Sequence, residues 1–303
     1  MNESFSIEVR GLRKTYGERE AVRGIDFTVR RGEVYAMLGP NGAGKTTTVE
    51  ILEGYRERTS GEVSVLGFDP GKGERSFRER VGIVLQETSV DPYLKVEETI
   101  ELYRGYYPHP RPLDDVIQLV GLTEQRGTRV RRLSGGQQRR LDVAIGLCGD
   151  PDLLFLDEPT TGFDPAARRD AWEMIRSLQN LGKTIFLTTH YMDEAEHLAD
   201  RVAIVRRGEI IAEGAPDQLI STDPTTTLRF GLPAGAEDVI AGLEGIRRGA
   251  DGFYVIETEA PTAVLYELTR RATGRSVELF ELTVSRPTLE DTYLRLVEGE
   301  EGA

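Results

Sequence analysis

The sequence predicts an α/β fold with a largely parallel sheet, followed by a small α+β domain. Three observations lead to this prediction. A short apolar run at 34–38, typical of a buried strand, passes directly into a glycine-rich segment and then a helix. Farther along, apolar strands alternate with helices, which implies parallel strands joined by helical crossovers. A polar, turn-rich stretch at 221–227 separates this pattern from shorter elements.

The individual elements follow from apolar periodicity and turn residues. Alternating apolar positions predict strands over 7–12 and 25–29, and short apolar runs predict two more at 63–65 and 81–85. Residues 90–149 read as a mostly helical subdomain. The alternation that follows comprises a strand at 153–156, a helix at 166–181, a strand at 184–188, a helix at 191–199 and strands at 202–205 and 210–211.

The chain is expected to form two domains, at 1–220 and 221–303. The second segment holds 15 acidic and 8 basic residues, so it carries −7 of the net charge of −13. Its expected elements are strands at about 227–230, 253–258 and 277–284 and helices at about 236–243, 262–272 and 287–297. Leu289, Tyr293, Leu296 and Val297 give the last of these helices an apolar face.

The glycine-rich segment Gly39-Pro40-Asn41-Gly42-Ala43-Gly44-Lys45-Thr46 is a phosphate-binding P-loop. Its glycines let backbone N–H groups close around an anion, and the N-terminus of the helix at 45–52 adds positive potential. Lys45 is expected to reach the β- and γ-phosphates, and the Thr46 hydroxyl to hold Mg²⁺. ATP and Mg²⁺ are therefore the predicted ligands.

Two carboxylates, Asp157 and Glu158, end the apolar strand at 153–156. Ligands of open α/β sheets bind at such strand ends, so Asp157 is a candidate Mg²⁺ ligand and Glu158 a candidate general base for water. Charged residues at the end of a buried strand are also common without any function. The upstream P-loop favours the catalytic interpretation.

Three further residues are informative only in combination. His190 follows a strand and could donate a hydrogen bond to the γ-phosphate. Tyr16 could stack on adenine, and Gln86 follows the strand ending at Leu85. Taken singly, each is equally consistent with an ordinary structural or surface residue. The glycine-rich Leu133-Ser134-Gly135-Gly136-Gln137 could open a helix and bind phosphate there.

Composition argues against several functional classes. The net charge of −13 disfavours binding to nucleic acid phosphates. No apolar run approaches the roughly 18 residues that span a bilayer, and the first residues do not resemble a secretory signal. The lone Cys148 excludes an internal disulfide and a cysteine-rich zinc site, and its apolar setting predicts a buried thiol. We expect a cytoplasmic protein.

The ordered set of motifs resembles the ATP-binding subunits of ABC transporters over the first 220 residues. The resemblance rests on Tyr16, the P-loop, Gln86, the segment 133–137, Asp157-Glu158, Asp164 and His190. It implies an ABC cassette that hydrolyses ATP as a head-to-tail dimer of two copies. In such a dimer the nucleotide of one subunit is contacted by a segment of the opposite subunit, comprising Ser134, Gly135, Gly136 and Gln137. Asp164 belongs to the loop that joins the two sites. Thr47 contacts nucleotide, and Gln86 contacts Mg²⁺. The family usually has Gly-Leu-Asp where this chain has Gly162-Phe163-Asp164.

The C-terminal Pro287-Thr288-Leu289-Glu290-Asp291-Thr292-Tyr293-Leu294 is similar to the ending of ABC-2-type exporter ATPases of the daunorubicin-resistance-like group. An amphipathic helix with acidic caps would give the same pattern. The resemblance implies a bacterial subunit at the cytoplasmic face of the membrane, bound to a separately encoded ABC-2-type permease. Drug, lipid or polysaccharide-precursor export all fit.

Two alternatives belong to other functional classes. A soluble ABC ATPase of translation or DNA maintenance usually carries paired cassettes, long coiled coils or zinc cysteines, and this sequence has none of them. A nucleotide-binding switch with negligible turnover is disfavoured by the presence of both Glu158 and His190. The discriminating observation is a neighbouring gene for a protein with about six membrane spans.

Overall fold

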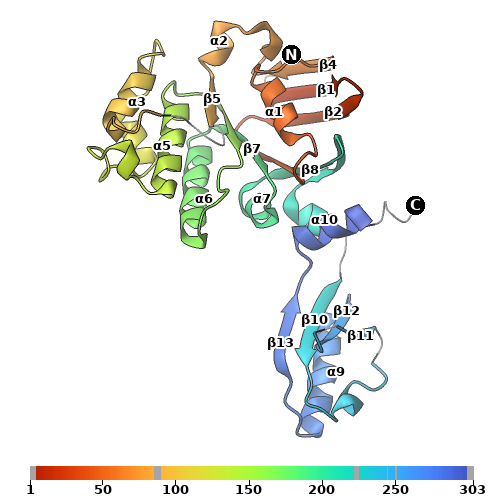
Figure 1. Ribbon diagram of the computed structural model, residues 1–303. Helices are drawn as coiled ribbons and strands as arrows, with labels where there is room; N and C mark the ends of the chain where they lie inside the picture. The colour runs from red at the N-terminus through yellow and green to blue at the C-terminus, as the bar shows by residue number, and fades with distance from the viewer. Residues whose placement is uncertain (1–4, 85–89, 222–224, 244, 250, 299–303) are drawn as a thin grey trace. The chain divides into compact units, whose positions relative to one another are not determined.

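The computed structural model describes residues 5–84, 90–221, 225–243, 245–249 and 251–298. The chain divides into two compact units, residues 1–216 and 217–303 (Figure 1). Each unit has its own cluster of buried apolar side chains. Among the described residues, no helix combines the length and hydropathy needed to cross a bilayer.

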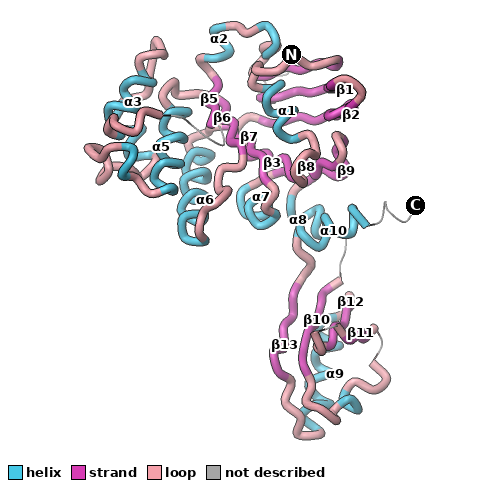
Figure 2. The backbone as a smooth tube through the Cα atoms, in the orientation of Figure 1, coloured by secondary structure: helices cyan, strands magenta, loops and turns pink. Residues whose placement is uncertain are grey.

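A six-stranded sheet forms the centre of the N-terminal unit (Figure 2). Its strands lie in the order β5 (Val81–Val84), β6 (Leu153–Asp157), β7 (Thr184–Thr189), β3 (Val34–Leu38), β8 (Arg201–Arg206) and β9 (Glu209–Gly214). All neighbouring pairs are parallel except β8 and β9. The expected parallel sheet is thus confirmed. Because β3, β6 and β7 are parallel neighbours, the residues that follow them meet at one edge.

A second, antiparallel sheet packs against the first. It consists of β2 (Arg19–Arg30), β1 (Phe5–Tyr16) and β4 (Ser60–Val65), in that order. The core between the two sheets contains stacked rings, with Phe27 and Phe186 each 5.5 Å from Tyr35 between centroids. The sequence indicated these strands but not that they form a separate sheet.

Helices cover both faces of the central sheet. Helix α1 (Lys45–Leu52) packs with the same core as Tyr35, Met37 and Phe155, which fixes it on the face toward the antiparallel sheet. Because side chains alternate along a strand, the opposite face is left for α6 (Pro165–Asn180) and α7 (Met192–Leu198). Two short helices, η1 (Pro70–Lys72) and α2 (Arg75–Arg78), precede β5.

The expected helical subdomain is present between β5 and β6. It contains α3 (Val96–Arg104), α4 (Leu113–Leu119), the short η2 (Val130–Arg132) and α5 (Gly135–Leu147). Val116, Ile117 and Ile100 are buried within it. Cys148 follows α5 and is fully buried, as expected, and burial raises the pKa of its thiol to about 12.

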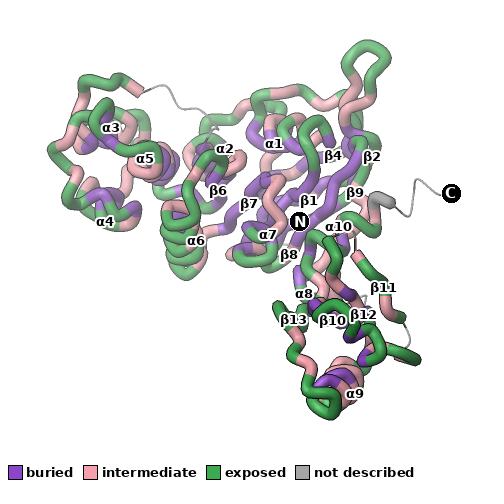
Figure 3. The backbone as a smooth tube through the Cα atoms, turned by 60° about the horizontal axis from the view of Figure 1, so that its bottom comes forward, coloured by how far each residue is buried: buried purple, intermediate pink, exposed green. Residues whose placement is uncertain are grey.

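The C-terminal unit is an antiparallel sheet with one long helix. Its elements are β10 (Thr226–Gly231), η3 (Glu237–Val239), β11 (Ile246–Arg248), β12 (Tyr254–Thr258), α9 (Pro261–Gly274), β13 (Phe280–Ser285) and α10 (Leu289–Glu298), preceded by α8 (Pro216–Ser221). The strand order is β11-β12-β10-β13. Leu268 and Ala272 of α9 share a core with the buried side chains of β10 and β12. Figure 3 marks the buried stretches of the backbone.

The predicted helix at 236–243 is wrong. Only Glu237–Val239 form a single helical turn, and the chain then passes through Gly242 and Gly245, both at positive φ, into the unpredicted strand β11. The strand expected at 277–284 begins later, at Phe280. On α10, Leu289 is fully buried, whereas Tyr293 and Leu296 are half-buried.

Candidate nucleotide site

The loop between β3 and α1 is built so that only glycine fits at two of its positions. A Cβ on Gly39 would lie 2.3 Å from the carbonyl oxygen of Val205, and one on Gly44 would lie 2.6 Å from that of Ala21. Gly44 also has φ 111°, a conformation that favours glycine. Glycine at these positions therefore lets the loop pack closely against β8 and β2, and the loop leads into the N-terminus of α1, which suits an anion.

Lys45 is buried inside this loop. Its Nζ donates hydrogen bonds to the carbonyl oxygens of Gly39 at 2.6 Å and Pro40 at 3.3 Å. Burial lowers the pKa of Lys45, and the nearby carboxylates of Glu158 and Asp157 oppose that shift. A cation held this way can exchange its carbonyl partners for phosphate oxygens.

A cavity of about 400 Å³ opens beside the loop. The sequence-predicted residues Tyr16, Asn41, Gly42, Gly44, Thr46 and Thr47 line it together with Lys45, Arg19, Ala21, Arg56 and Glu158. The Tyr16 ring is partly exposed, and two cationic side chains lie against it. Lys14 Nζ is 5.0 Å and Arg56 Cζ 5.3 Å from the ring centroid. An aromatic face beside several cations suits a nucleotide, which combines a base with phosphates.

Asp157 and Glu158 lie at the carboxyl end of β6, next to the end of β7. The hydroxyl of Thr188 donates a hydrogen bond to Asp157 Oδ1, which orients that carboxylate. Glu158 has φ 46°, in the left-handed region that is uncommon for a side-chain-bearing residue. Its N–H donates to the Thr188 carbonyl oxygen at 3.1 Å, so the neighbouring strand holds this strained conformation in place.

The Glu158 carboxylate lies close to two other predicted site residues, Lys45 and His190. Its Oε1 lies 3.9 Å from Lys45 Nζ and 3.2 Å from His190 Nδ1. Its Oε2 accepts a hydrogen bond from Thr161 Oγ1 at 3.1 Å. The structure thus brings together the predicted base, the P-loop lysine and the histidine after β7, although these residues are far apart in the sequence.

The donor set near the P-loop fits Mg²⁺. Among the described residues there is no cluster of three or more histidine, cysteine, aspartate or glutamate side chains that could hold a metal alone. Mg²⁺ in nucleotide sites needs only one or two carboxylates, because hydroxyl, water and phosphate oxygens complete its shell. Thr46 and the oriented Asp157 supply such oxygens. The third predicted ligand, Gln86, lies outside the described residues.

Ser134 caps helix α5. Its Oγ accepts a hydrogen bond from the Gln137 N–H at 3.3 Å, while Gln137 Oε1 accepts one from the Ser134 N–H at 3.0 Å. This reciprocal capping box starts the helix and leaves Gly135 and Gly136 in its first turn. The segment is a helix N-terminus without bulky side chains, as its glycines indicated.

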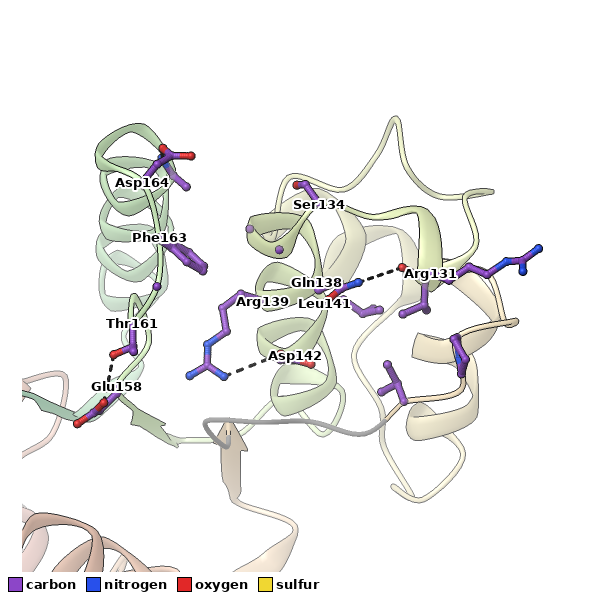
Figure 4. Close-up of a pocket in the computed structure, with 17 residues that line it drawn as sticks. Arg131, Ser134, Gln138, Arg139, Leu141, Asp142, Glu158, Thr161, Phe163 and Asp164 are labelled. Carbon is purple, nitrogen blue, oxygen red and sulfur yellow. Dashed lines mark hydrogen bonds and ion pairs between the residues drawn. The ribbon is translucent and has the colours of Figure 1, made fainter. Parts of the chain in front are cut away.

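A second cavity, of about 850 Å³, lies between α5 and the loop before α6 (Figure 4). Ser134, Gly135 and Gly136 line one side of it, and Thr161, Phe163 and Asp164 line the other. The Asp164 carboxylate accepts from the N–H groups of Ala166 and Ala167 at 2.9 Å each, and therefore caps α6. Phe163, which stands where the resembled family usually has leucine, faces the cavity.

The P-loop and the Ser134 segment line different cavities. Of the two cavities, Lys45 and Thr46 line the smaller, whereas Ser134 and Asp164 line the larger. Among the described residues, Glu158 lines both. The cavity beside the P-loop is therefore not lined by the Ser134 segment of the same chain.

Two charged residues at the site were missed by sequence reasoning. Arg139 of α5 is buried and donates to the carbonyl oxygens of Asp157 at 2.8 Å and Pro159 at 3.2 Å. Burial lowers the pKa of its guanidinium, and the nearby Asp142 carboxylate opposes that shift. Glu194 of α7 is also fully buried. A charged residue inside a helix gives no sequence signal of burial, so only the structure identifies these two.

Comparison with known proteins gives one consistent result. The family model described as ABC transporter matches residues 22–161. The chain is 38% identical over 306 residues to the Nod factor export ATP-binding protein I of Burkholderia orbicola (strain AU 1054), covering 97% of both chains. It is 35% identical over 304 residues to the daunorubicin resistance ATP-binding protein DrrA3 of Streptomyces coeruleorubidus, covering 96% of this chain and 95% of that protein.

Solved structures agree with these relatives. The chain resembles cbiO1 from Clostridium perfringens, described as part of an ABC transporter complex, with a TM-score of 0.67 and 26% identity. The match covers 80% of this chain and 96% of cbiO1. A second solved chain, described as the ATP-binding subunit of an ABC transporter, matches with a TM-score of 0.64 over 71% of this chain.

Proposed function

Because this chain belongs to the ATP-binding, ATP-hydrolysing subunits of ABC exporters, we propose that it powers export through a separate ABC-2-type membrane permease. Relatives matched over nearly their whole length carry out export or confer resistance, as their names state. The similarity includes the C-terminal unit, which supports the narrower exporter group. The permease sets the exported compound, and drug, lipid and polysaccharide precursors remain the candidate classes.

The observation that carries the proposed mechanism is the position of Glu158. Its carboxylate lies at the edge of the P-loop cavity, beside both Lys45 and His190. A water molecule placed against the γ-phosphate would be within its reach, so Glu158 can accept the proton as water attacks phosphorus. The bond from the γ-phosphorus to the bridging oxygen breaks, and ADP and phosphate leave.

The surrounding residues stabilise charge during this step. Lys45 exchanges its carbonyl partners for phosphate oxygens, and His190 donates a hydrogen bond to the γ-phosphate. Thr46, Asp157 and Gln86 would hold Mg²⁺, which neutralises charge on the phosphate oxygens when bound. Thr188 keeps the Asp157 carboxylate oriented toward that position.

We further propose that the active form is a head-to-tail pair of two copies. The cavities support it, because Ser134 does not line the cavity beside the P-loop of its own chain. In the pair, the N-terminus of α5 from one copy would face the γ-phosphate held by the other. Asp164 would lie near the junction of the two sites.

The proposed cellular place is the cytoplasmic face of the bacterial membrane, reached through the permease. The C-terminal unit is proposed to dock or regulate rather than to catalyse. Its separate core and the location of every predicted nucleotide contact before residue 191 support this role. The net charge of −13 counts against the alternative partner, nucleic acid.

Co-purification with a permease tests the proposal. The full chain and a chain ending at Ser221 are each produced with a tagged candidate ABC-2-type permease of about six membrane spans, and the permease is isolated from membranes. We expect the full chain to co-purify and its ATPase activity to rise, while the shortened chain binds ATP but is retained less. A full chain that binds only RNA or ribosomes under these conditions would contradict the exporter role.

A further inference from the structure

Glu194 is the most deeply buried carboxylate near the catalytic residues. It lies on α7 with no exposed surface, four residues after His190. Its Oε1 accepts a hydrogen bond from Thr160 Oγ1 at 2.8 Å and another from Trp172 Nε1 at 3.4 Å.

The contacts of Glu194 connect the two segments that carry the proposed catalytic groups. Thr160 is fully buried and lies two residues after Glu158, in the loop that leads to Asp164. Glu194 itself lies on α7, which follows His190 at the end of β7. One buried side chain therefore holds the loop after β6 and the end of β7 together.

Neighbouring contacts add to this connection. Arg168 of α6 forms an ion pair with Asp193 at 3.0 Å and places its guanidinium 4.3 Å from the centre of the Tyr191 ring. The Tyr191 ring in turn lies 4.1 Å from the imidazole of His190. The segment from His190 to Glu194 is thus held by α6 as well as by the loop after β6.

The Glu194 carboxyl acts as an acceptor rather than as a charge partner. Burial raises its pKa, and the neighbouring Thr189 hydroxyl and the hydrogen bonds from Thr160 and Trp172 oppose that shift. Its Oε2 is buried and has no hydrogen-bond partner among the described residues.

We propose that Glu194 is a positioning residue that fastens the loop carrying Glu158 to the segment carrying His190. The proposal rests on the proposed catalytic roles of Glu158 and His190. Without this fastening, nucleotide would still bind at the P-loop, but the base and the histidine would no longer keep the geometry in which Oε1 and Nδ1 lie 3.2 Å apart. The loss would appear in kcat rather than in the KM for ATP.

Thr160→Val tests this with little change of shape, because it removes only the hydroxyl that binds Glu194. The matched control is Thr99→Val, since Thr99 is equally buried on α3 and its hydroxyl bonds only the Lys95 carbonyl oxygen. We expect kcat of Thr160→Val to be about tenfold below the control, with KM within about twofold and the same melting temperature. Thr160→Ser, which keeps the hydroxyl, should restore kcat.

Glu194 itself provides the second comparison. Glu194→Gln retains an acceptor oxygen and should keep kcat within about threefold of wild type, whereas Glu194→Ala should lose at least about tenfold. The proposal is overturned by a Thr160→Val kcat equal to the control, by a loss that Thr160→Ser does not restore, or by full kcat in Glu194→Ala. Activity of Glu158→Gln, measured alone, separates a failure of the proposed base from a failure of this inference.

Discussion

The carboxylate of Glu158 lies 3.9 Å from the ammonium group of Lys45, across the ends of strands β6 and β3. Glu158 is the proposed base for water, and Lys45 belongs to the P-loop. Their approach follows from the strand order, because β7 alone separates the two strands. The sheet therefore places the proposed proton acceptor beside the P-loop lysine.

Glu158→Gln should bind ATP with near wild-type affinity but lose at least about 100-fold in kcat, because the amide keeps the shape and cannot accept the proton. Phosphate release and a fluorescent ATP-binding titration measure the two quantities. Glu173→Gln, on the exposed side of α6, is the matched control. Hydrolysis by Glu158→Gln at the rate of this control would remove Glu158 as the base.

Lys45→Ala should weaken ATP binding by at least about tenfold, since it deletes a buried cation that can pair with phosphate. Lys72→Ala, at an exposed position on η1, should leave affinity unchanged. Isothermal calorimetry with ATP and Mg²⁺ gives both values. Equal dissociation constants for the two variants would contradict the P-loop assignment.

Local sequence patterns predicted the elements that begin or end beside a residue with a special backbone conformation. Helix α1 begins at Lys45 and ends at Leu52 as expected, because Gly44 needs a left-handed conformation and the helix starts after it. The helix expected at 236–243 failed because its apolar spacing came from packing around η3, with Gly242 ending any regular repeat. Periodicity cannot distinguish a buried turn from a short helix.

The candidate site was predictable only where a motif accompanies the chemistry. The P-loop and Asp157-Glu158 have such motifs, and their residues meet in the structure. No chemical role was predicted for Arg139 or Glu194, because their burial arises from tertiary contacts of α5 and α7 with the loop after β6. Exposure of a charged helical residue is the default expectation, and here it misleads.

Ser134→Arg should abolish turnover while leaving ATP binding to the same chain intact, because its P-loop is unchanged. A mixture of Ser134→Arg and Lys45→Ala chains forms some pairs with one undamaged composite site. We expect this mixture to regain ATPase activity that neither variant shows alone. ATPase activity of Ser134→Arg alone at the wild-type level would show that the Ser134 segment does not contact nucleotide.

Glu53 predicts a pH-dependent stability. It is buried at the end of α1, and burial, with repulsion from Asp157 and Glu50, raises its pKa to about 8. In the unfolded chain a glutamate titrates near about 4.3, so between these values the folded state holds a proton that the unfolded state has released. The contribution of Glu53 to the free energy of unfolding is therefore largest below about pH 4. It falls by up to about 1.4 kcal/mol per pH unit as the pH rises to about 8.

Glu53→Gln removes that fall, so its stability gain over wild type should increase from pH 5 to pH 8, as measured by urea unfolding. Glu57→Gln, four residues farther along at an exposed position, serves as the control. A gain for Glu53→Gln that is independent of pH would contradict the titration of Glu53 in this range.

The molar mass of Glu158→Gln with saturating ATP and Mg²⁺ tests the central claim most directly, namely that the nucleotide is held between two copies. Light scattering after size exclusion should give about twice the chain mass of 33.7 kDa, and Ser134→Arg introduced into the same variant should return it to 33.7 kDa. A mass of 33.7 kDa for Glu158→Gln under these conditions, with ATP shown to be bound, would contradict the composite site.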